Sequence, residues 1–308
     1  MSTAQPAEMS GTTPAGVPAA SRASAGRSPG SRSEGRTLGV FSQGFLVLWA
    51  CMAAGPLLWA AMSSLKTDGQ ILESPWSLPT SLNWENWVRA WNGAHIGEYT
   101  LNSLVVVIPS VLGTMLLGSM TAYVLARFEF PGNRFIYYLF VGGMTFPVIM
   151  AIVPLFFVMK NLSLLSTPHG LILAYIAYSL PFTTFFMTAF FRTLPGAIAE
   201  AAMIDGASHA RVFFQVMLPM AKPGLVSIGI FNFLGQWNQY LLPIALNTED
   251  PDKALLTQGL ATLAVSQGYK GDWSGLFAGL TIATLPVLVV YTVFQRQVQA
   301  GLTSGALK

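Results

Sequence analysis

EAAMIDGAS, residues 200–208, is an orderly polar segment between two long apolar runs that contain no Asp, Glu, Lys or Arg. The first run covers residues 161–191 and the second covers residues 223–248. Each run exceeds the roughly 20 apolar residues that a helix needs to cross a bilayer. A membrane protein that carries a patterned polar segment between two spans presents this segment to water, and the fold is organised around this connection.

The composition identifies lipid as the solvent of this chain. Hydrophobic residues make up 53% of the 308 residues and charged residues only 9%, with a mean hydropathy of +0.53. A soluble globular protein carries about 25% charged residues. Because lipid offers no partner to backbone N–H and C=O groups, the spans must be helices. The single cysteine, Cys51, excludes an intrachain disulfide.

Six intervals between consecutive charged residues are long and apolar enough to cross a bilayer. We therefore predict an all-α integral membrane protein with six transmembrane helices, at about residues 42–64, 101–125, 136–158, 170–191, 224–246 and 274–295. Each span contains proline, which removes a backbone donor and favours a bend, and bent helices favour a bundle around a cavity. Residues 254–269 are too short and too polar for a span, so we expect an external loop that is helical only in part.

The N-terminal segment differs from the rest of the chain. Residues 1–38 are rich in Ser, Ala, Gly, Pro and Arg and contain almost no large apolar side chains. Such a segment cannot bury enough surface to offset its ordering entropy, so we predict a disordered cytoplasmic tail, followed by a transmembrane domain at residues 39–308. A signal peptide is the alternative, but the leader and the apolar run after it are too long for one.

Orientation follows from the Lys and Arg residues, which concentrate on the cytoplasmic side of membrane proteins. With the N-terminus in the cytoplasm, that side holds 11 of the 16 Lys and Arg residues. The five on the outer side are Lys66, Arg89, Lys160, Lys253 and Lys270. Both termini and the segment at 200–208 are therefore predicted to be cytoplasmic.

The first outer loop contains four tryptophans. Trp84, Trp87 and Trp91 have the spacing i, i+3, i+7 after two possible capping residues, Ser81 and Asn83, and Trp76 precedes them. This spacing predicts an amphipathic helix at the outer membrane interface. The helix either anchors the fold in the interface or docks an external partner.

The cytoplasmic segment predicts a helix-turn-helix. Pro195 suits the first position of a helix, and Gly206 suits its end, where a positive φ is tolerated. Ser208 can cap a second helix that ends before Pro219. Small and polar side chains form one narrow face of the first helix, namely Ile198, Ala201, Ala202 and Asp205. A stiff, small-faced helix at the membrane surface is suited to a groove of a partner, although a solvated connector remains the alternative.

The fifth predicted span carries four polar or aromatic residues in a row, Gln236, Trp237, Asn238 and Gln239. Uncharged polar side chains at this depth either join helices by hydrogen bonds or line a substrate path. An indole beside amides would suit a neutral polyhydroxyl ligand. Both interpretations stay open at this stage.

Several motifs are missing from the sequence. There is no Gly-Lys dipeptide and therefore no phosphate-binding P-loop. His95, His169 and His209 have no metal-ligand spacing, and no predicted span contains a charged residue. These absences argue against ATP hydrolysis, enzymatic chemistry and proton coupling by this chain, and we expect it to need no cofactor of its own.

The polar segment resembles the EAA loop of ABC importer permeases. The matching residues are Glu200-Ala201-Ala202, Asp205-Gly206-Ala207, Phe213, Leu218-Pro219 and Lys222-Pro223. Residues 40–308 as a whole resemble the maltose-type permeases of the carbohydrate uptake family, through Ser64–Asp68, Asn102-Ser103, Ala122-Tyr123, Ala126-Arg127, Trp237-Asn238 and residues 301–308. Met203, His209 and Val216 are mild departures from the loop pattern.

The resemblance implies a permease subunit of a binding-protein-dependent ABC importer in the cytoplasmic membrane of a bacterium. It implies a heterodimer with a second, homologous permease. It also implies two cytoplasmic ATPase subunits that bind the ATP and an extracytoplasmic sugar-binding protein. It implies no nucleic-acid partner. The cargo would be a di- or oligosaccharide of the maltose or chitobiose kind. The ATPase-coupling residues would be Glu200, Ala201, Ala202, Asp205 and Gly206. The alternative is a self-sufficient channel or facilitator for polar solutes.

Overall fold

The computed structural model describes residues 31–247 and 250–306. Within these residues every regular element is a helix and no strand occurs. The elements are α1 (Ser31–Ser63), α2 (Asp68–Glu73), α3 (Glu85–Val88), the π-helix η1 (Arg89–Gly93), α4 (Ile96–Arg127), α5 (Asn133–Thr145), α6 (Val148–Asn161), α7 (Pro168–Thr193), α8 (Gly196–Ile204), α9 (His209–Arg211), the π-helix η2 (Val212–Met217), α10 (Leu218–Met220), α11 (Lys222–Trp237), α12 (Leu241–Leu246), the 3₁₀-helix η3 (Pro251–Lys253), α13 (Leu256–Lys270) and α14 (Trp273–Ala306).

Among the described residues, four helices are long and apolar enough to cross a bilayer singly, at Ser42–Ser63 within α1, α4, α7 and Trp273–Gln297 within α14. Two bent helix pairs raise the number to as many as six when each pair counts as one span, namely Asn133–Thr145 with Val148–Asn161 and His209–Met220 with Lys222–Trp237. The predicted all-α membrane fold is confirmed, with four to six candidate spans.

The predicted third span, residues 136–158, is two helices rather than one. α5 ends at Thr145, α6 begins at Val148, and the two axes meet at 105°. Proline disfavours the helical region for the residue before it, and Phe146 is accordingly extended with ψ 120°. Pro147 then begins α6 as its N-cap. Both halves are too short to cross a bilayer core of about 30 Å alone, because a helix rises 1.5 Å per residue.

The predicted fifth span, residues 224–246, is also divided. α11 ends at Trp237 and α12 begins only at Leu241. The Asn238 side chain donates to the Leu234 carbonyl at 2.8 Å, and the Gln239 side chain accepts from the Leu241 amide at 3.1 Å. Such local side-chain bonds compete with the helical ladder, so the amides themselves break the span.

α4 and α7 form the centre of the unit at residues 55–308, and their close packing depends on small residues. A Cβ atom at Gly113 would lie 2.6 Å from the Ile176 side chain, and one at Gly118 would lie 2.6 Å from Thr183. Small residues at a helix interface let backbones approach, which is the usual basis of helix association in lipid. α11 packs against both helices and against α14.

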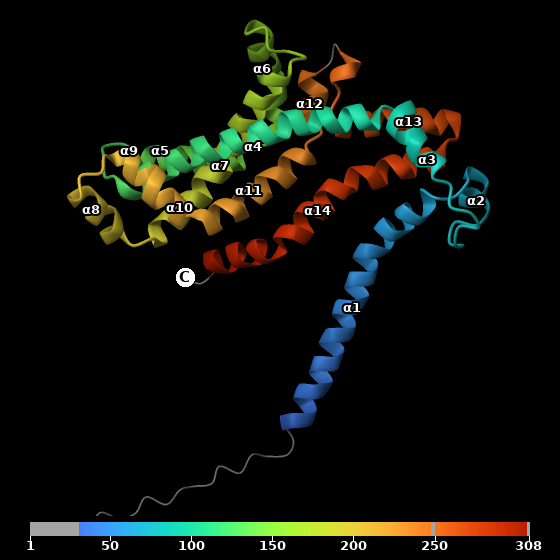
Figure 1. Ribbon diagram of the computed structural model, residues 1–308, viewed down its shortest axis with the longest axis horizontal. Coiled ribbons are helices and arrows are strands. Elements are labelled where there is room, and N and C mark those ends of the chain that lie inside the picture. Colours follow the sequence, from blue (N-terminus) through green and yellow to red (C-terminus); the bar gives the residue numbers. More distant parts are fainter. Residues whose placement is uncertain (1–30, 248–249, 307–308) are drawn as a thin grey trace, which may run out of the picture. The chain divides into compact units, whose positions relative to one another are not determined.

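The two ends of α4 carry different structures. α8, α9 and α10 gather at its C-terminal end, whereas α3 and α13 lie at its N-terminal end (Figure 1). Residues 254–269, expected as a loop with partial helix, are almost wholly the helix α13. Leu256 and Leu263 of α13 are buried, and the Leu256 amide donates to Ser103 Oγ at 2.8 Å. Apolar side chains at helical spacing explain why this segment is a packed helix.

The first outer loop is folded around a buried lysine. The Lys66 side chain is fully buried, and its Nζ donates to the carbonyls of Ser74 at 3.2 Å and Pro75 at 2.9 Å. Among the described tryptophans of this loop, Trp87 packs inward and donates to Ser64 Oγ at 3.1 Å, while Trp76, Trp84 and Trp91 are exposed. The predicted tryptophan helix exists as α3 and η1. Its N-cap residue is Trp84, so neither Ser81 nor Asn83 caps it.

The described part of the N-terminal unit, residues 31–54, belongs to α1, which begins at Ser31. The predicted boundary at residue 38 therefore falls inside a helix. Residues 1–30, most of the predicted tail, lie outside the described residues. The membrane-crossing window of α1 has none of its residues buried inside the chain.

Candidate functional site

The polar segment at residues 200–208 begins with α8. Pro195 precedes α8 as its N-cap with ψ 125°, so the helix starts one residue later than predicted. Asp205 is its C-cap, and Gly206 adopts a φ of +84°, a conformation that L-residues with side chains rarely adopt. The predicted glycine-dependent end of the helix is confirmed.

α8 has an inner face and an exposed face. Ala199 is buried and Ala202 is half-buried, and both pack into a cluster with residues of α4, α7 and η2. Glu200 and Ala201 are exposed, and Ile204 is 86% exposed. The predicted face is therefore corrected at Ala202, which lies toward the protein because residues three apart on a helix share one side.

The second helix of the segment is anchored on α4 and α7. Ser208 Oγ accepts from the Arg211 amide at 3.4 Å, as predicted for a cap. The Phe213 ring lies 5.1 Å from the Tyr123 ring of α4, and the Tyr123 ring lies 5.6 Å from the Phe191 ring of α7. Pro219 does not end the helix as predicted, because it occupies the first turn of α10, where no amide donor is needed.

The segment continues directly into α11. The helical stretch His209–Met220 meets Lys222–Trp237 at 77°, and the residue at the bend, Ala221, is fully buried. A buried bend is fixed by its surroundings, since protein interiors are close-packed. The second helix of the segment is therefore joined to α11 through a buried bend.

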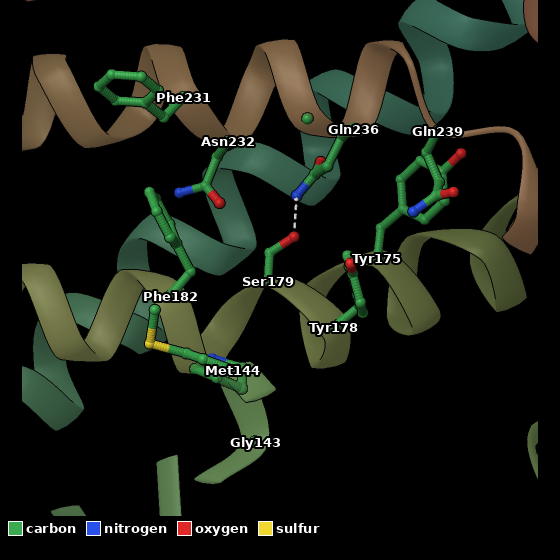
Figure 2. Close-up of a pocket in the computed structure, with 12 residues that line it drawn as sticks. Gly143, Met144, Tyr175, Tyr178, Ser179, Phe182, Phe231, Asn232, Gln236 and Gln239 are labelled. Atoms are coloured by element: carbon green, nitrogen blue, oxygen red, sulfur yellow. Dashed lines mark hydrogen bonds between the residues drawn. The ribbon is translucent and has the colours of Figure 1, made fainter. Parts of the chain in front are cut away.

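α11 lines a pocket together with α7 and the end of α5. The pocket has a volume of about 370 Å³, within the range of roughly 300–1,000 Å³ for small-molecule sites. Figure 2 shows side chains of α7 and α11 facing one another across it. The lining residues are Gly143, Met144, Tyr175, Tyr178, Ser179, Pro181, Phe182, Phe231, Asn232, Gly235, Gln236 and Gln239.

Polar groups join the two walls of the pocket. Gln236 Nε2 donates to Ser179 Oγ at 3.0 Å, the bond dashed in Figure 2, and Asn232 Nδ2 donates to Thr183 Oγ1 at 2.8 Å. Two buried atoms of lining residues, Gln236 Oε1 and the Tyr175 hydroxyl, have no hydrogen-bond partner in the described part of the chain. Unpaired polar atoms cost about 1–3 kcal/mol each when buried, so a movement of the walls that exposed either atom would let it gain a partner.

The four consecutive residues predicted for the substrate path separate in the structure. Gln236 and Gln239 line the pocket. Trp237 turns toward α14, where its Nε1 donates to the Ala283 carbonyl at 3.3 Å, and Asn238 is exposed outside the pocket. Successive helical residues point about 100° apart, so four in a row cannot face one cavity.

Sequence reasoning missed most of the pocket, although a spacing signal was available. The α7 wall is formed by Tyr175, Tyr178, Ser179 and Phe182, and the α11 wall by Asn232, Gly235, Gln236 and Gln239. Both sets follow i, i+3, i+4, i+7, the spacing of one helical face. Two such stripes on neighbouring spans could have predicted the facing walls.

Comparison with known proteins agrees with this geometry. Residues 114–304, more than half of the chain, match the family of binding-protein-dependent transport system inner membrane components. The chain is 54% identical over 276 residues to the diacetylchitobiose uptake system permease protein NgcG of Streptomyces coelicolor, covering 90% of this chain and 91% of that one. It is 33% identical to the trehalose transport system permease protein SugB of Mycobacterium tuberculosis, covering 82% of this chain and 92% of that one.

A solved structure shares the fold. The crystal structure of a bacterial ABC transporter involved in the import of the acidic polysaccharide alginate matches with a TM-score of 0.73 at 21% identity, covering 85% of this chain and 96% of that chain. The relatives are transporter permease subunits rather than enzymes. The chain therefore belongs to the binding-protein-dependent transport system inner membrane components, the permease family of ABC importers.

Proposed function

We propose that this chain is the sugar-translocating permease subunit of an ABC importer, with a disaccharide or short oligosaccharide as cargo. The observation that carries the proposal is the 54% identity to a diacetylchitobiose permease over nearly the whole length of both chains. A disaccharide of N-acetylated sugars is accordingly the first cargo to test. The trehalose permease relative supports the broader class of neutral saccharides.

The pocket chemistry supports a neutral saccharide. Sugars present hydroxyl groups and apolar C–H faces, and the α7 wall offers aromatic rings while the α11 wall offers amides. Amides both donate and accept hydrogen bonds. The buried Gln236 Oε1 and Tyr175 hydroxyl would gain partners from sugar hydroxyls once α11 moves relative to α7 and exposes them. Among the described residues, no Asp, Glu, Lys or Arg lines this pocket.

The connection between α8 and the pocket supports a coupling mechanism. The exposed residues Glu200, Ala201, Asp205 and Gly206 would contact a cytoplasmic ATPase subunit, with the half-buried Ala202 holding α8 on the bundle. Closure of the ATPase dimer on ATP would displace α8. Because α8 packs on η2, and η2 runs through α10 and a buried bend into α11, the displacement would move the α11 wall relative to α7.

The partners follow from this mechanism. One chain supplies one set of pocket walls, so a second, non-identical permease would complete the translocation path as a heterodimer. Two ATPase subunits would supply the ATP sites, and an extracytoplasmic binding protein would deliver the sugar, as the description of the family implies. The arginines and lysines near α8 support a cytoplasmic location for that end of the bundle and for both termini, in a bacterial cytoplasmic membrane.

The test is reconstitution of the complex that co-purifies with this chain. We expect diacetylchitobiose with its binding protein to stimulate ATP hydrolysis and ATP-dependent uptake into proteoliposomes. Maltose, trehalose and a charged oligosaccharide such as an alginate fragment serve as competing cargoes. Stimulation by the alginate fragment but by none of the neutral sugars would contradict the proposed cargo class. Sugar flux through the purified chain alone, without ATP, would instead favour a self-sufficient channel.

A further inference from the structure

A second, polar pocket lies at the end of the bundle that carries α8. It has a volume of about 610 Å³ and lies where α4 ends, α5 begins and α7 ends. Three arginines line it, Arg127 from α4, Arg134 from α5 and Arg192 from α7. Arg127 and Arg134 flank the short turn between α4 and α5, and the fold brings Arg192 of α7 beside them.

The charge of this pocket is unbalanced. One carboxylate, Glu129, lines it beside the three guanidinium groups. No ion pair to Arg127, Arg134 or Arg192 occurs among the described residues. α5 also begins in the pocket, and the first-turn amides of a helix add partial positive charge there. The site is therefore built to receive an anion.

Two of the three arginines have defined contacts, and Arg134 is exposed. Arg127 Nη2 donates to the Leu194 carbonyl, and the buried Arg127 Nε has no hydrogen-bond partner in the described part of the chain. The guanidinium carbon of Arg192 lies 5.3 Å from the centre of the Tyr137 ring, a cation–π contact. Pre-positioned guanidinium groups match phosphate oxygens in two-point contacts and lose little entropy on binding.

The rim of the pocket continues into an apolar stripe. Phe135, Tyr138 and Leu139 on α5 are 72%, 66% and 64% exposed, respectively. They have the spacing i, i+3, i+4 and form one face of the helix that begins at the arginines. A free phosphate ion would use the charges alone, whereas a phospholipid would use the charges for its headgroup and the stripe for its acyl chains.

We propose that this arginine pocket binds the headgroup of an anionic phospholipid at the cytoplasmic membrane surface. Basic pockets between transmembrane helices on this side of a membrane are suited to such headgroups. The bound lipid would neutralise the excess positive charge of the pocket. Because Arg127 also holds the Leu194 carbonyl, one residue before the N-cap of α8, the lipid would steady the base of the proposed coupling helix.

The test measures lipid binding to the complex purified through a tag on this chain and exchanged into phosphatidylcholine nanodiscs. Phosphatidylglycerol is then titrated, and bound lipid is counted by native mass spectrometry. We expect one tightly bound phosphatidylglycerol per chain at this site. Removal of one charge by Arg192→Gln or Arg134→Gln should weaken its binding about fivefold, from the contribution of one basic residue near an anionic lipid. The matched control Lys160→Gln removes one exposed charge at the far end of α6 and should leave binding unchanged.

Three results would overturn the proposal. The first is equal binding of phosphatidylcholine and phosphatidylglycerol by the wild-type complex. The second is an equal loss of binding in Lys160→Gln and in both arginine variants. The third is displacement of the lipid by inorganic phosphate at an equal concentration, which would assign the site to a free anion. Thermal unfolding of each variant distinguishes a lost site from a misfolded chain, and uptake of sugar does not enter the measurement.

Discussion

Replacement of Gln236 by leucine is expected to weaken transport without a large loss of stability. The Gln236 side chain is buried in the wall of the α11–α7 pocket and donates to Ser179 Oγ at 3.0 Å. Its Oε1 has no partner in the described part of the chain. Leucine has a similar volume and no polar atom, so the substitution removes the bond to Ser179, a long one to Thr114 Oγ1 at 3.5 Å, and one unpaired acceptor together.

The two effects on stability oppose each other. An interhelical hydrogen bond in a membrane protein contributes about 0.6–1.7 kcal/mol, whereas relief of an unpaired buried acceptor returns about 1–3 kcal/mol. Ser179 can turn its hydroxyl to a backbone carbonyl in the preceding turn of α7. The net change in the free energy of unfolding is therefore between about 1 kcal/mol of loss and about 2 kcal/mol of gain.

The effect on transport is expected to be a loss of affinity. The sugar loses one acceptor, because the amide nitrogen of Gln236 is already bonded within the chain. One hydrogen bond of about 0.5–1.5 kcal/mol corresponds to about 2- to 13-fold in apparent affinity. The assay measures sugar uptake against external concentration, with thermal unfolding of the same preparation. Gln295→Leu, the same change at an exposed site on α14, serves as the control. Unchanged uptake in Gln236→Leu would refute a role of this pocket in the sugar path, and a loss of stability above about 3 kcal/mol would show a structural role instead.

Three further predictions address the coupling helix, the packing and the outer loop. Glu200→Arg reverses an exposed charge and should leave thermal stability unchanged while abolishing uptake and ATPase stimulation; normal uptake would exclude the coupling role. Gly170→Ala would place its Cβ 2.1 Å from the Leu164 carbonyl oxygen and should lower stability by about 1–3 kcal/mol. In the control Gly142→Ala the new Cβ atom would have no neighbouring atom within 4 Å, so the melting temperature should not fall. Lys66→Met would remove two buried hydrogen bonds, although Ser77 and Trp59 still donate to the same carbonyls, and should cost about 1–3 kcal/mol; an unchanged melting temperature would contradict this account.

The sequence predicted the number and location of the apolar segments, because charge is nearly absent from lipid-facing helices. It did not predict where the helices break. Pro109, Pro181 and Pro286 lie inside continuous helices, whereas Pro147 begins a new helix after a 105° bend. Proline alone does not decide between these outcomes, because neighbouring helices can satisfy the backbone groups that it frees.

The pocket was only partly predictable, for a different reason. The consecutive polar residues in the predicted fifth span identified the correct part of α11 as the pocket wall. Within that part, however, Trp237 faces α14 and Asn238 faces outward. Residue types show which side chains can bind a sugar, but the rotation of a helix about its axis is set by packing. The spacing of Tyr175, Tyr178 and Ser179 on α7 contained that information, and it becomes readable only when the partner helix is known.

The lack of burial in the membrane-crossing window of α1 has a consequence for how this part of the sequence can vary. None of the residues in that window is buried inside the chain, so within the N-terminal unit, which ends at Ala54, no neighbouring helix selects one apolar side chain over another. Substitution tolerance in this unit should follow the cost of transfer from water to hydrocarbon. A saturation mutagenesis scan of residues 42–54 would accept exchanges among Leu, Ile, Val and Phe and reject charges, whereas alanine at Gly118 of α4 would place its Cβ 2.6 Å from the Thr183 side chain and should lower stability.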